Sequence, residues 1–229
     1  MKYLKLFERF KNKPKFILLV GPPASGKSTY IRRVLSKELN NDFVVIERDS
    51  IVSEIAAKFD MTYDDTFIAP SKDIPEDFVH PKYGKVVGSP KGVIWSPKSY
   101  EVISKINAKI FREFSKRLKE AIENKQNIIM DLTNMNHKTR KGILKFIKDK
   151  KDDFFKIAIV FNNGGKGLED LLFKVAKRRQ KQIEKEGGKK TIRKDVFKRM
   201  IDNYLEPTKE EGFDEIRFVD NRRNLEKII

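Results

Sequence analysis

Five short apolar runs lie along the chain, separated by longer segments in which apolar residues recur every three or four positions. The runs are residues 16–20, 43–46, 128–130, 155–161 and 216–219. Near-continuous apolar runs of this length are typical of strands buried on both faces of a parallel sheet, and the intervening period is that of amphipathic helices. The alternation predicts an α/β fold with a doubly wound, mainly parallel five-stranded sheet.

Three of the intervening segments are expected to be helical: residues 27–37, 98–124 and 136–148. In the longest, six apolar residues from Ile103 to Ile122 fall at helical spacing and mark one face. In the last, Ile143, Leu144 and Ile147 are expected to point inward.

Residues 61–97 interrupt this pattern with five prolines and three glycines, too many breakers for regular structure. Loops of this length in a compact domain are usually functional or disordered. Aromatic residues, including Tyr63 and Trp95, argue against disorder. We expect an ordered insertion over one mouth of the active site.

A second distinctive stretch, residues 176–199, holds eleven Lys or Arg against three acidic residues, with Gly187 and Gly188 between two helix-compatible halves. A glycine hinge between helices is what a closing segment needs. We therefore expect a basic helical lid at 166–204 within a single domain spanning residues 1–229.

The chain of 229 residues has a formal net charge of +17, which favours a polyanionic partner, although a lysine-rich source proteome would give the same excess. Without cysteine, thiolate metal sites and cysteine nucleophiles are excluded. No apolar run reaches the ~18–20 residues of a membrane span. The basic, mildly amphipathic segment before Phe16 is followed by only five apolar residues, too few for the core of a signal peptide. This segment could lie on a membrane surface, but we expect it to pack against the sheet. We expect an intracellular, cytoplasmic protein without a membrane partner, of unspecified oligomeric state.

Directly after the first apolar run, Gly21-Pro-Pro-Ala-Ser-Gly-Lys-Ser-Thr29 satisfies the phosphate-loop pattern. A chance glycine-rich turn could match it, but strand, loop and helix follow in the order that the chemistry requires. The expected nucleotide-binding residues are Gly21, Ser25, Gly26, Lys27, Ser28 and Thr29. Lys27 would reach the β- and γ-phosphates, and Ser28 would ligate Mg²⁺. The sequence predicts ATP and Mg²⁺ as cofactors.

Two aspartates follow strands of the predicted sheet. Asp49 comes after the second strand, where a carboxylate could take the proton of an attacking hydroxyl; it could equally cap the next helix. Asp131 ends the third strand like a Walker B aspartate and could support Mg²⁺, orient the acceptor or cap a turn. Position alone leaves both roles open for Asp49, and we favour a functional role for Asp131.

Four basic residues cluster near the start of the predicted lid: Lys177, Arg178, Arg179 and Lys181. Any one of them could simply belong to a solvated face. As a group, they could stabilise the negative charge of a transferring phosphoryl.

Together these elements resemble the 5′-hydroxyl polynucleotide kinases of bacteriophages and the related kinase domains of eukaryotic end-healing enzymes. The resemblance rests on the phosphate loop, Arg48-Asp49, Asp131-Leu-Thr-Asn134, Val175-Ala-Lys-Arg178, Glu206-Pro207 and Glu211-Gly-Phe-Asp-Glu-Ile216. It implies a P-loop kinase fold with a helical lid, and it is compatible with a virus- or phage-encoded protein.

By position, the resemblance implies that Asp49 is the general base, that Lys27 acts on the phosphates and that Arg178 is a lid arginine on the nucleotide. It places Asp131, Arg48, Thr133 and Asn134 on the acceptor side. Two positions depart from the pattern. Val52 stands where the phage enzyme has an acceptor-binding arginine, and Gln182 stands where a second lid arginine is expected.

The leading hypothesis is an ATP-dependent polynucleotide kinase that acts on the 5′-hydroxyl end of DNA or RNA. The alternative is a P-loop kinase for a small acceptor such as a nucleoside or sugar, which leaves the charge of +17 unexplained. A third class is a non-catalytic, nucleotide-gated nucleic-acid binder, which would need neither Asp49 nor the lid arginines.

Overall fold

The computed structural model describes residues 13–59, 63–66, 79–80, 84–85, 87–89, 92–94, 97–186, 190–191, 193–220 and 222. The chain divides into two compact units. The sheet unit comprises residues 1–48, 116–182 and 192–229, and the insertion unit comprises residues 49–115 and 183–191. Each unit is described below by itself.

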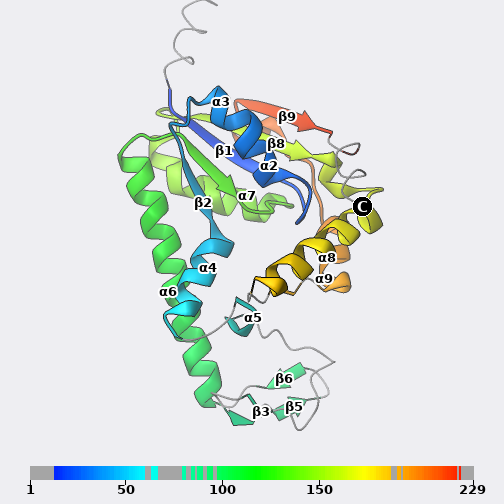
Figure 1. Cartoon of the computed structure of the whole chain (residues 1–229). Helices are drawn as coiled ribbons and strands as arrows, with labels where there is room; N and C mark the ends of the chain where they lie inside the picture. The colour runs from blue at the N-terminus through cyan, green and yellow to red at the C-terminus, as the bar shows by residue number, and fades with distance from the viewer. Residues whose placement is uncertain are drawn as a thin grey trace, which may run out of the picture. The chain divides into compact units, whose positions relative to one another are not determined.

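A five-stranded parallel sheet forms the centre of the sheet unit (Figure 1). Its strands are β1 (Lys15–Val20), β2 (Val44–Glu47), β7 (Ile128–Asp131), β8 (Phe155–Phe161) and β9 (Glu215–Val219). They lie in the order β2-β7-β1-β8-β9, and every neighbouring pair is parallel. All five predicted strands and the predicted α/β fold are confirmed.

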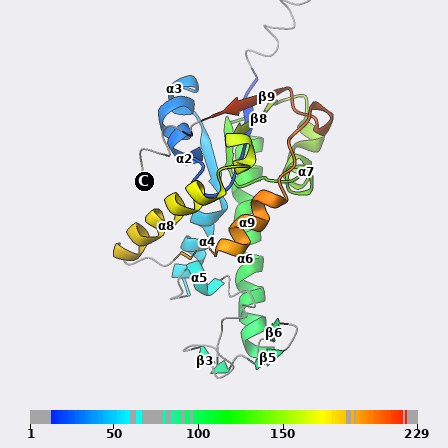
Figure 2. The ribbon, with the colours of Figure 1, turned by 90° about the vertical axis from the view of Figure 1, so that its right-hand side faces the viewer.

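Helices cover both faces of this sheet, with α2 and α3 on one side and α7 on the other (Figure 2). The segment after the phosphate loop comprises α2 (Lys27–Tyr30), a π-helical stretch (Ile31–Leu35) and α3 (Ser36–Glu38). Beneath it, the side chains of β1, β7 and β8 form a buried apolar cluster with Ile31 and Leu35. This burial on both faces explains the continuous apolar runs of the central strands.

Helix α6 (Pro97–Glu123) agrees with its predicted range to within one residue at each end. The predicted helix at 136–148 is shorter: α7 spans His137–Leu144, and a 3₁₀ segment continues to Lys150. Ile147 is buried as expected, whereas Ile143 and Leu144 are only half-buried. The most buried side chain of α7 is Arg140, which the apolar pattern did not indicate.

The basic segment contains two helices, α8 (Glu169–Lys185) and α9 (Lys194–Asp202). In the sheet unit the two helices pack through Phe173 and Phe197, whose rings meet edge to face at 5.7 Å. The two helical halves are therefore confirmed. The proposed hinge at Gly187 and Gly188 lies outside the described residues, and the closing motion stays a prediction.

The insertion unit contains helix α4 (Arg48–Ala57) except for its first residue, which belongs to the sheet unit. It also contains α5 (Tyr63–Thr66) and two short antiparallel strand pairs. The pairs are β3 (Val79–His80) with β4 (Gly84–Lys85), and β5 (Val87–Ser89) with β6 (Gly92–Ile94). The expectation that residues 61–97 hold too many breakers for regular structure was therefore wrong for these stretches, because prolines and glycines can flank strands of two or three residues. The rest of the predicted insertion lies outside the described residues.

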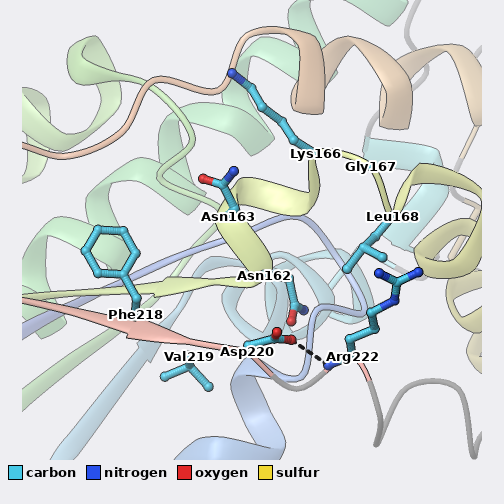
Figure 3. A pocket seen from close by; sticks show the side chains of 9 residues that line it. All are labelled: Asn162, Asn163, Lys166, Gly167, Leu168, Phe218, Val219, Asp220 and Arg222. Carbon is cyan, nitrogen blue, oxygen red and sulfur yellow. Dashed lines mark hydrogen bonds between the residues drawn. The ribbon is translucent and has the colours of Figure 1, made fainter.

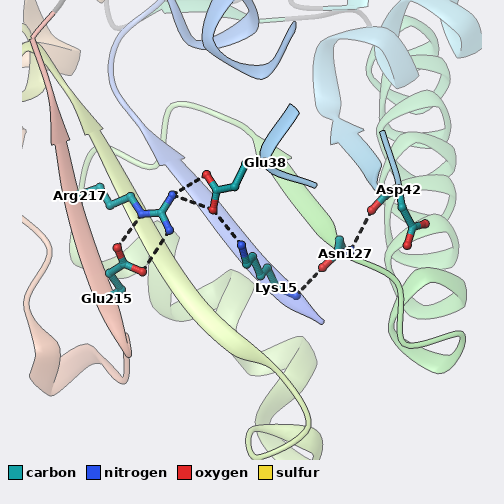
Figure 4. A network of polar contacts seen from close by, with 6 residues as sticks. All are labelled: Lys15, Glu38, Asp42, Asn127, Glu215 and Arg217. Carbon is teal, nitrogen blue, oxygen red and sulfur yellow. Dashed lines mark hydrogen bonds and ion pairs between the residues drawn. The ribbon is translucent and has the colours of Figure 1, made fainter. Parts of the chain in front are cut away.

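Ion pairs join the strand starts of the sheet unit to α3 (Figure 4). The Arg217 guanidinium donates to both Glu215 and Glu38, and Glu38 also accepts from Lys15 at 2.8 Å. Partial burial tends to raise the pKa of Glu38, but the hydrogen bonds and charges of Arg217 and Lys15 outweigh it and lower this pKa. This network holds the end of the sheet opposite to the phosphate loop, which follows the carboxyl end of β1.

Candidate active site

The phosphate loop connects β1 to α2 through a backbone that requires glycine. Gly26 has φ 95°, a left-handed conformation that glycine adopts without strain. At Gly21 a side chain would come within 2.8 Å of the Ser25 hydroxyl and 3.1 Å of Phe161, so the close packing also demands glycine there. Thr29 is exposed in α2. The loop thus leads into the helix as the motif predicted.

Lys27 lies folded over this loop. Its ammonium donates to the carbonyl oxygens of Gly21, at 3.0 Å, and Pro22, at 2.9 Å, and its side chain is buried. These bonds hold a positive charge against the loop whose backbone N–H groups are suited to phosphate.

Ser28 is hydrogen-bonded to Asp131, which comes from strand β7 beside β1. The Ser28 hydroxyl, on α2, donates at 3.1 Å to Oδ2 of Asp131, the last residue of β7, which is the parallel neighbour of β1. A hydroxyl and a carboxylate are oxygen ligands of the kind that Mg²⁺ prefers, and Mg²⁺ usually takes its remaining ligands from water and phosphate. No cluster of three or more acidic, histidine or cysteine residues suited to a metal occurs in the described part of the chain. The donor set therefore fits Mg²⁺ bound together with a nucleotide.

The segment after β7 is bonded to the phosphate loop. The Gly21 N–H donates to the Thr133 carbonyl at 3.0 Å, and the buried Asn134 amide donates to the Leu19 carbonyl at 3.0 Å. Asn134 has φ 46°, which asparagine tolerates better than most residues. These contacts make the segment a support of the loop. Acceptor binding by Thr133 and Asn134 stays a prediction.

Arg140 of α7 holds the segment after β7 in place. Its guanidinium is fully buried, donates to the Asn134 carbonyl at 3.1 Å and forms a double hydrogen bond with Glu211 at 2.6 and 2.8 Å. Burial tends to raise the pKa of Glu211, but the hydrogen bond and charge of Arg140 outweigh it and lower this pKa. Arg140 was absent from the sequence-based site, and its partner lies 71 residues away.

Asp49 lies in the insertion unit, two residues after Glu47, which pairs in register with Asp131. Its Oδ1 accepts a hydrogen bond from the Tyr63 hydroxyl at 2.8 Å, and its Oδ2 is bonded to the Lys190 ammonium. Neither Tyr63 nor Lys190 was assigned to the site from sequence, although both lie in the two unusual stretches. Arg48, the preceding residue, is exposed.

Arg178 and Arg179 are exposed on α8, while Val175 and Ala176 of the same helix are buried. The Lys177 ammonium is bonded to Gln180 and lies 5.6 Å from the Phe173 ring centre. Gln182, at the position of the missing second lid arginine, is exposed. The helix thus presents Arg178 and Arg179 on its solvent face, and their action on a nucleotide stays a prediction.

A cavity of about 420 Å³ opens beside the loop, beyond the carboxyl ends of β8 and β9 (Figure 3). Its lining comprises Asn162, Asn163, Lys166, Gly167, Leu168, Phe218, Val219, Asp220 and Arg222. The Asn162 amide donates to the Ser25 carbonyl at 3.3 Å, so the cavity adjoins the phosphate loop. Phe218 is 60% exposed, which is unusual for a large apolar side chain. The volume and the position beyond the carboxyl ends of the strands are suited to a small ligand.

The turn after β8 that lines this cavity depends on Gly164. Gly164 has φ 66°, and a side chain on it would overlap the buried ring of Tyr204. We expect Gly164→Ala to lower the free energy of unfolding by about 2–4 kcal/mol, because positive φ and overpacking both oppose it. Urea unfolding measures the change. Gly142→Ala is the control, since that helical site has free space for a methyl group; an equal effect of both variants would contradict the prediction.

A family model described as an AAA domain matches residues 16–162, which is more than half of the chain. The chain belongs to this AAA domain family. The matched range of the AAA domain contains the phosphate loop, Asp49, Asp131 and Asn162.

The AAA domain is also similar to solved structures. A "putative kinase" from Chloroflexus aurantiacus j-10-fl matches with 13% identity and a TM-score of 0.50, over 91% of this chain and 85% of that one. A structure from the PezAT toxin–antitoxin system of Streptococcus pneumoniae matches with 17% identity and a TM-score of 0.51, over 96% and 76%. A gluconokinase from Sinorhizobium meliloti 1021 matches with 11% identity and a TM-score of 0.44, over 94% and 87%. No curated protein sequence matches the chain.

At these identities the first two structures show the fold alone, and the third carries no argument. The AAA domain has an α/β fold of the P-loop kinase type. Such a fold implies a nucleotide substrate, usually ATP with Mg²⁺. Among the described residues, no helix has both the length and the apolar character needed to span a membrane.

Proposed function

We propose that this protein is a polynucleotide kinase, which transfers the γ-phosphate of ATP to the 5′-hydroxyl end of DNA or RNA. The observation that carries the proposal is the Ser28–Asp131 hydrogen bond beside the Lys27-bearing phosphate loop. This arrangement supplies the donor half of a phosphotransferase site.

In this proposal the phosphate loop, Lys27 and Ser28 hold the triphosphate. Mg²⁺, bound by Ser28 and Asp131, would neutralise phosphate charge. The cavity beside Asn162 accepts the base of the nucleotide, where the exposed Phe218 ring offers a stacking surface. Arg178 contributes positive charge to the transferring phosphoryl.

The transfer step assigns the base role to Asp49. The acceptor oxygen attacks the γ-phosphorus and its proton passes to the Asp49 carboxylate. The bond from the γ-phosphorus to the bridging oxygen breaks, and ADP leaves with the electron pair. Chain connectivity supports this assignment, because Asp49 follows the strand that pairs with the Asp131 strand.

The nature of the acceptor rests on charge and on resemblance. A net charge of +17 suits a polyanion, and α8 carries Arg178 and Arg179 on its exposed face. The Asp131-Leu-Thr-Asn134 segment matches that of polynucleotide kinases. The alternative, a kinase for a nucleoside or sugar, accounts for the donor half equally well but not for the charge.

Transfer from γ-labelled ATP to 5′-hydroxyl DNA and RNA oligonucleotides, beside free nucleosides, tests the proposal. We expect labelled oligonucleotide ends with the wild-type protein. Asp49→Asn should lower kcat about 100-fold or more, because the amide cannot take the proton, while calorimetry shows unchanged ATP affinity.

Glu54→Gln is the matched control, because it neutralises an exposed carboxylate on the same helix, α4, and leaves Asp49 intact. Label in nucleosides alone would favour the small-acceptor kinase. Full turnover by Asp49→Asn would remove the base assignment.

A further inference from the structure

Both carboxylate oxygens of Asp49 are occupied within the insertion unit. The Tyr63 hydroxyl donates to Oδ1 at 2.8 Å, and the Lys190 ammonium is bonded to Oδ2. The same ammonium lies 4.7 Å from the centre of the Tyr63 ring. A carboxylate, an ammonium and a phenol thus form one cluster at the candidate base.

The backbone beside Lys190 is held independently of Asp49. The Thr191 N–H and hydroxyl donate to the Asp64 carboxylate at 2.8 and 2.7 Å. Asp64 and Tyr63 both belong to α5, where the Thr66 hydroxyl bonds to the Tyr63 carbonyl at 2.7 Å. Because these contacts anchor the chain, Lys190 can leave Asp49 by rotating its side chain alone.

A general base needs an oxygen that can accept the proton of the reacting hydroxyl. The ion pair of Asp49 and Lys190 is partly exposed, with 44% and 27% of the two side chains accessible. Partly exposed ion pairs contribute little net free energy, since water competes for both charges. An anion on the acceptor can therefore draw the ammonium away at little cost and free Oδ2.

The position that would otherwise supply a cation to the acceptor cannot do so. Val52, three residues after Asp49, is fully buried on α4. A side chain at that position is enclosed by protein and does not reach the solvent. Lys190, which comes from a segment 141 residues away, is the cation that the structure places on Asp49 instead.

We propose that Lys190 exchanges Asp49 for the phosphate next to the reacting hydroxyl of the acceptor, and thereby couples recognition of a polynucleotide to release of the base. This role rests on the proposed kinase function. It makes Lys190 an acceptor-binding residue that selects hydroxyls with a neighbouring phosphodiester over those of nucleosides or sugars.

The experiment compares two 5′-hydroxyl oligonucleotides that differ only in the first linkage, which is a phosphodiester in one and a neutral methylphosphonate in the other. With the wild-type protein we expect the neutral linkage to raise KM about tenfold, the usual effect of losing one charge-assisted hydrogen bond. A neutral linkage further along the chain should change KM little.

With the phosphodiester acceptor, Lys190→Ala should already show the raised KM that the wild-type protein shows with the neutral linkage. Replacing the phosphodiester by the neutral linkage should raise the KM of this variant no further. Its kcat at saturation should stay near that of the wild type. Lys190→Arg should restore most of the sensitivity, because arginine also binds phosphate. Lys185→Ala, which removes an exposed lysine at the end of α8, should leave the sensitivity unchanged.

If Lys190→Ala remains as sensitive to the neutral linkage as the wild type, Lys190 does not bind that phosphate and the inference is wrong. If the wild-type protein labels no 5′-hydroxyl end, the proposed function itself fails, and the role of Lys190 fails with it. Unchanged ATP affinity of each variant separates either result from misfolding.

Discussion

Replacing Lys27 with alanine is expected to abolish phosphoryl transfer, with kcat reduced about 10³-fold or more. The ammonium is the positive charge that the structure holds against the phosphate loop, and charge on the equatorial oxygens grows as the phosphoryl group transfers. The fold should survive, because the hydrogen bonds of Lys27 to the Gly21 and Pro22 carbonyls lie within the phosphate loop. Single-turnover transfer from labelled ATP measures the effect, and circular dichroism checks the fold.

Lys37→Ala is the matched control for Lys27→Ala, since it removes a lysine exposed on α3 at the other end of the same helical segment. Its turnover should equal that of the wild type. Substantial transfer by Lys27→Ala would mean that another cation faces the γ-phosphate. In that case the donor half would have to be assigned again, with the α8 arginines as the first candidates.

Most of the sheet unit could be predicted from sequence because its signals are local. The runs at 16–20 and 157–161 belong to central strands covered on both faces, where every side chain is buried and apolar. The π-helical stretch Ile31–Leu35 within the predicted helix could not be foreseen, because π-helical residues carry no sequence pattern of their own. The strand pairs near residues 79–94 escaped for a similar reason: strands of two or three residues are too short to show alternation.

The candidate site divides in the same way. The order of strand, loop and helix was predicted because the three are contiguous in sequence, and Asp131 was indicated because it ends a strand beside β1; the roles of these residues in binding nucleotide and metal stay predictions. The partners of Asp49 were not predicted, since Tyr63 and Lys190 lie 14 and 141 residues away and belong to no motif. Polar contacts between residues so far apart in the sequence depend on tertiary packing, which the local pattern of apolar residues does not indicate.

Arg140 was missed because a charged residue on an amphipathic helix is normally assigned to the solvent face. Its burial is made possible by the carboxylate of Glu211, the acceptor of its double hydrogen bond, and by backbone carbonyl oxygens that accept its remaining N–H groups. The pair connects α7 to the Asn134 carbonyl, and the Asn134 amide in turn binds the end of β1. A buried ion pair thus supports the segment that holds the phosphate loop.

Replacement of Arg140 by alanine is therefore expected to lower the free energy of unfolding by about 3–5 kcal/mol, the usual cost of leaving one member of a buried ion pair without its partner. Denaturant unfolding at pH 7 measures the loss. The double variant Arg140→Met with Glu211→Gln should recover part of it, because no buried charge is then left unpaired. Arg199→Ala, which removes a largely exposed arginine 3.9 Å from Asp195, should change the free energy by less than about 1 kcal/mol.

The pH dependence gives this prediction a second readout. The folded pKa of Glu211 lies below its usual value of 4.5, so the pair stabilises the wild-type fold above that pH and loses its contribution as the pH falls through the folded pKa. In Arg140→Ala the hydrogen bond and charge of Arg140 no longer lower the pKa of Glu211, while burial still raises it. The folded carboxyl then takes up its proton more readily, so the variant should lose less stability than the wild type as the pH falls from 7 to 4. Parallel pH profiles for the two proteins would mean that Glu211 owes its lowered pKa to other contacts, such as the Thr208 N–H at 3.2 Å.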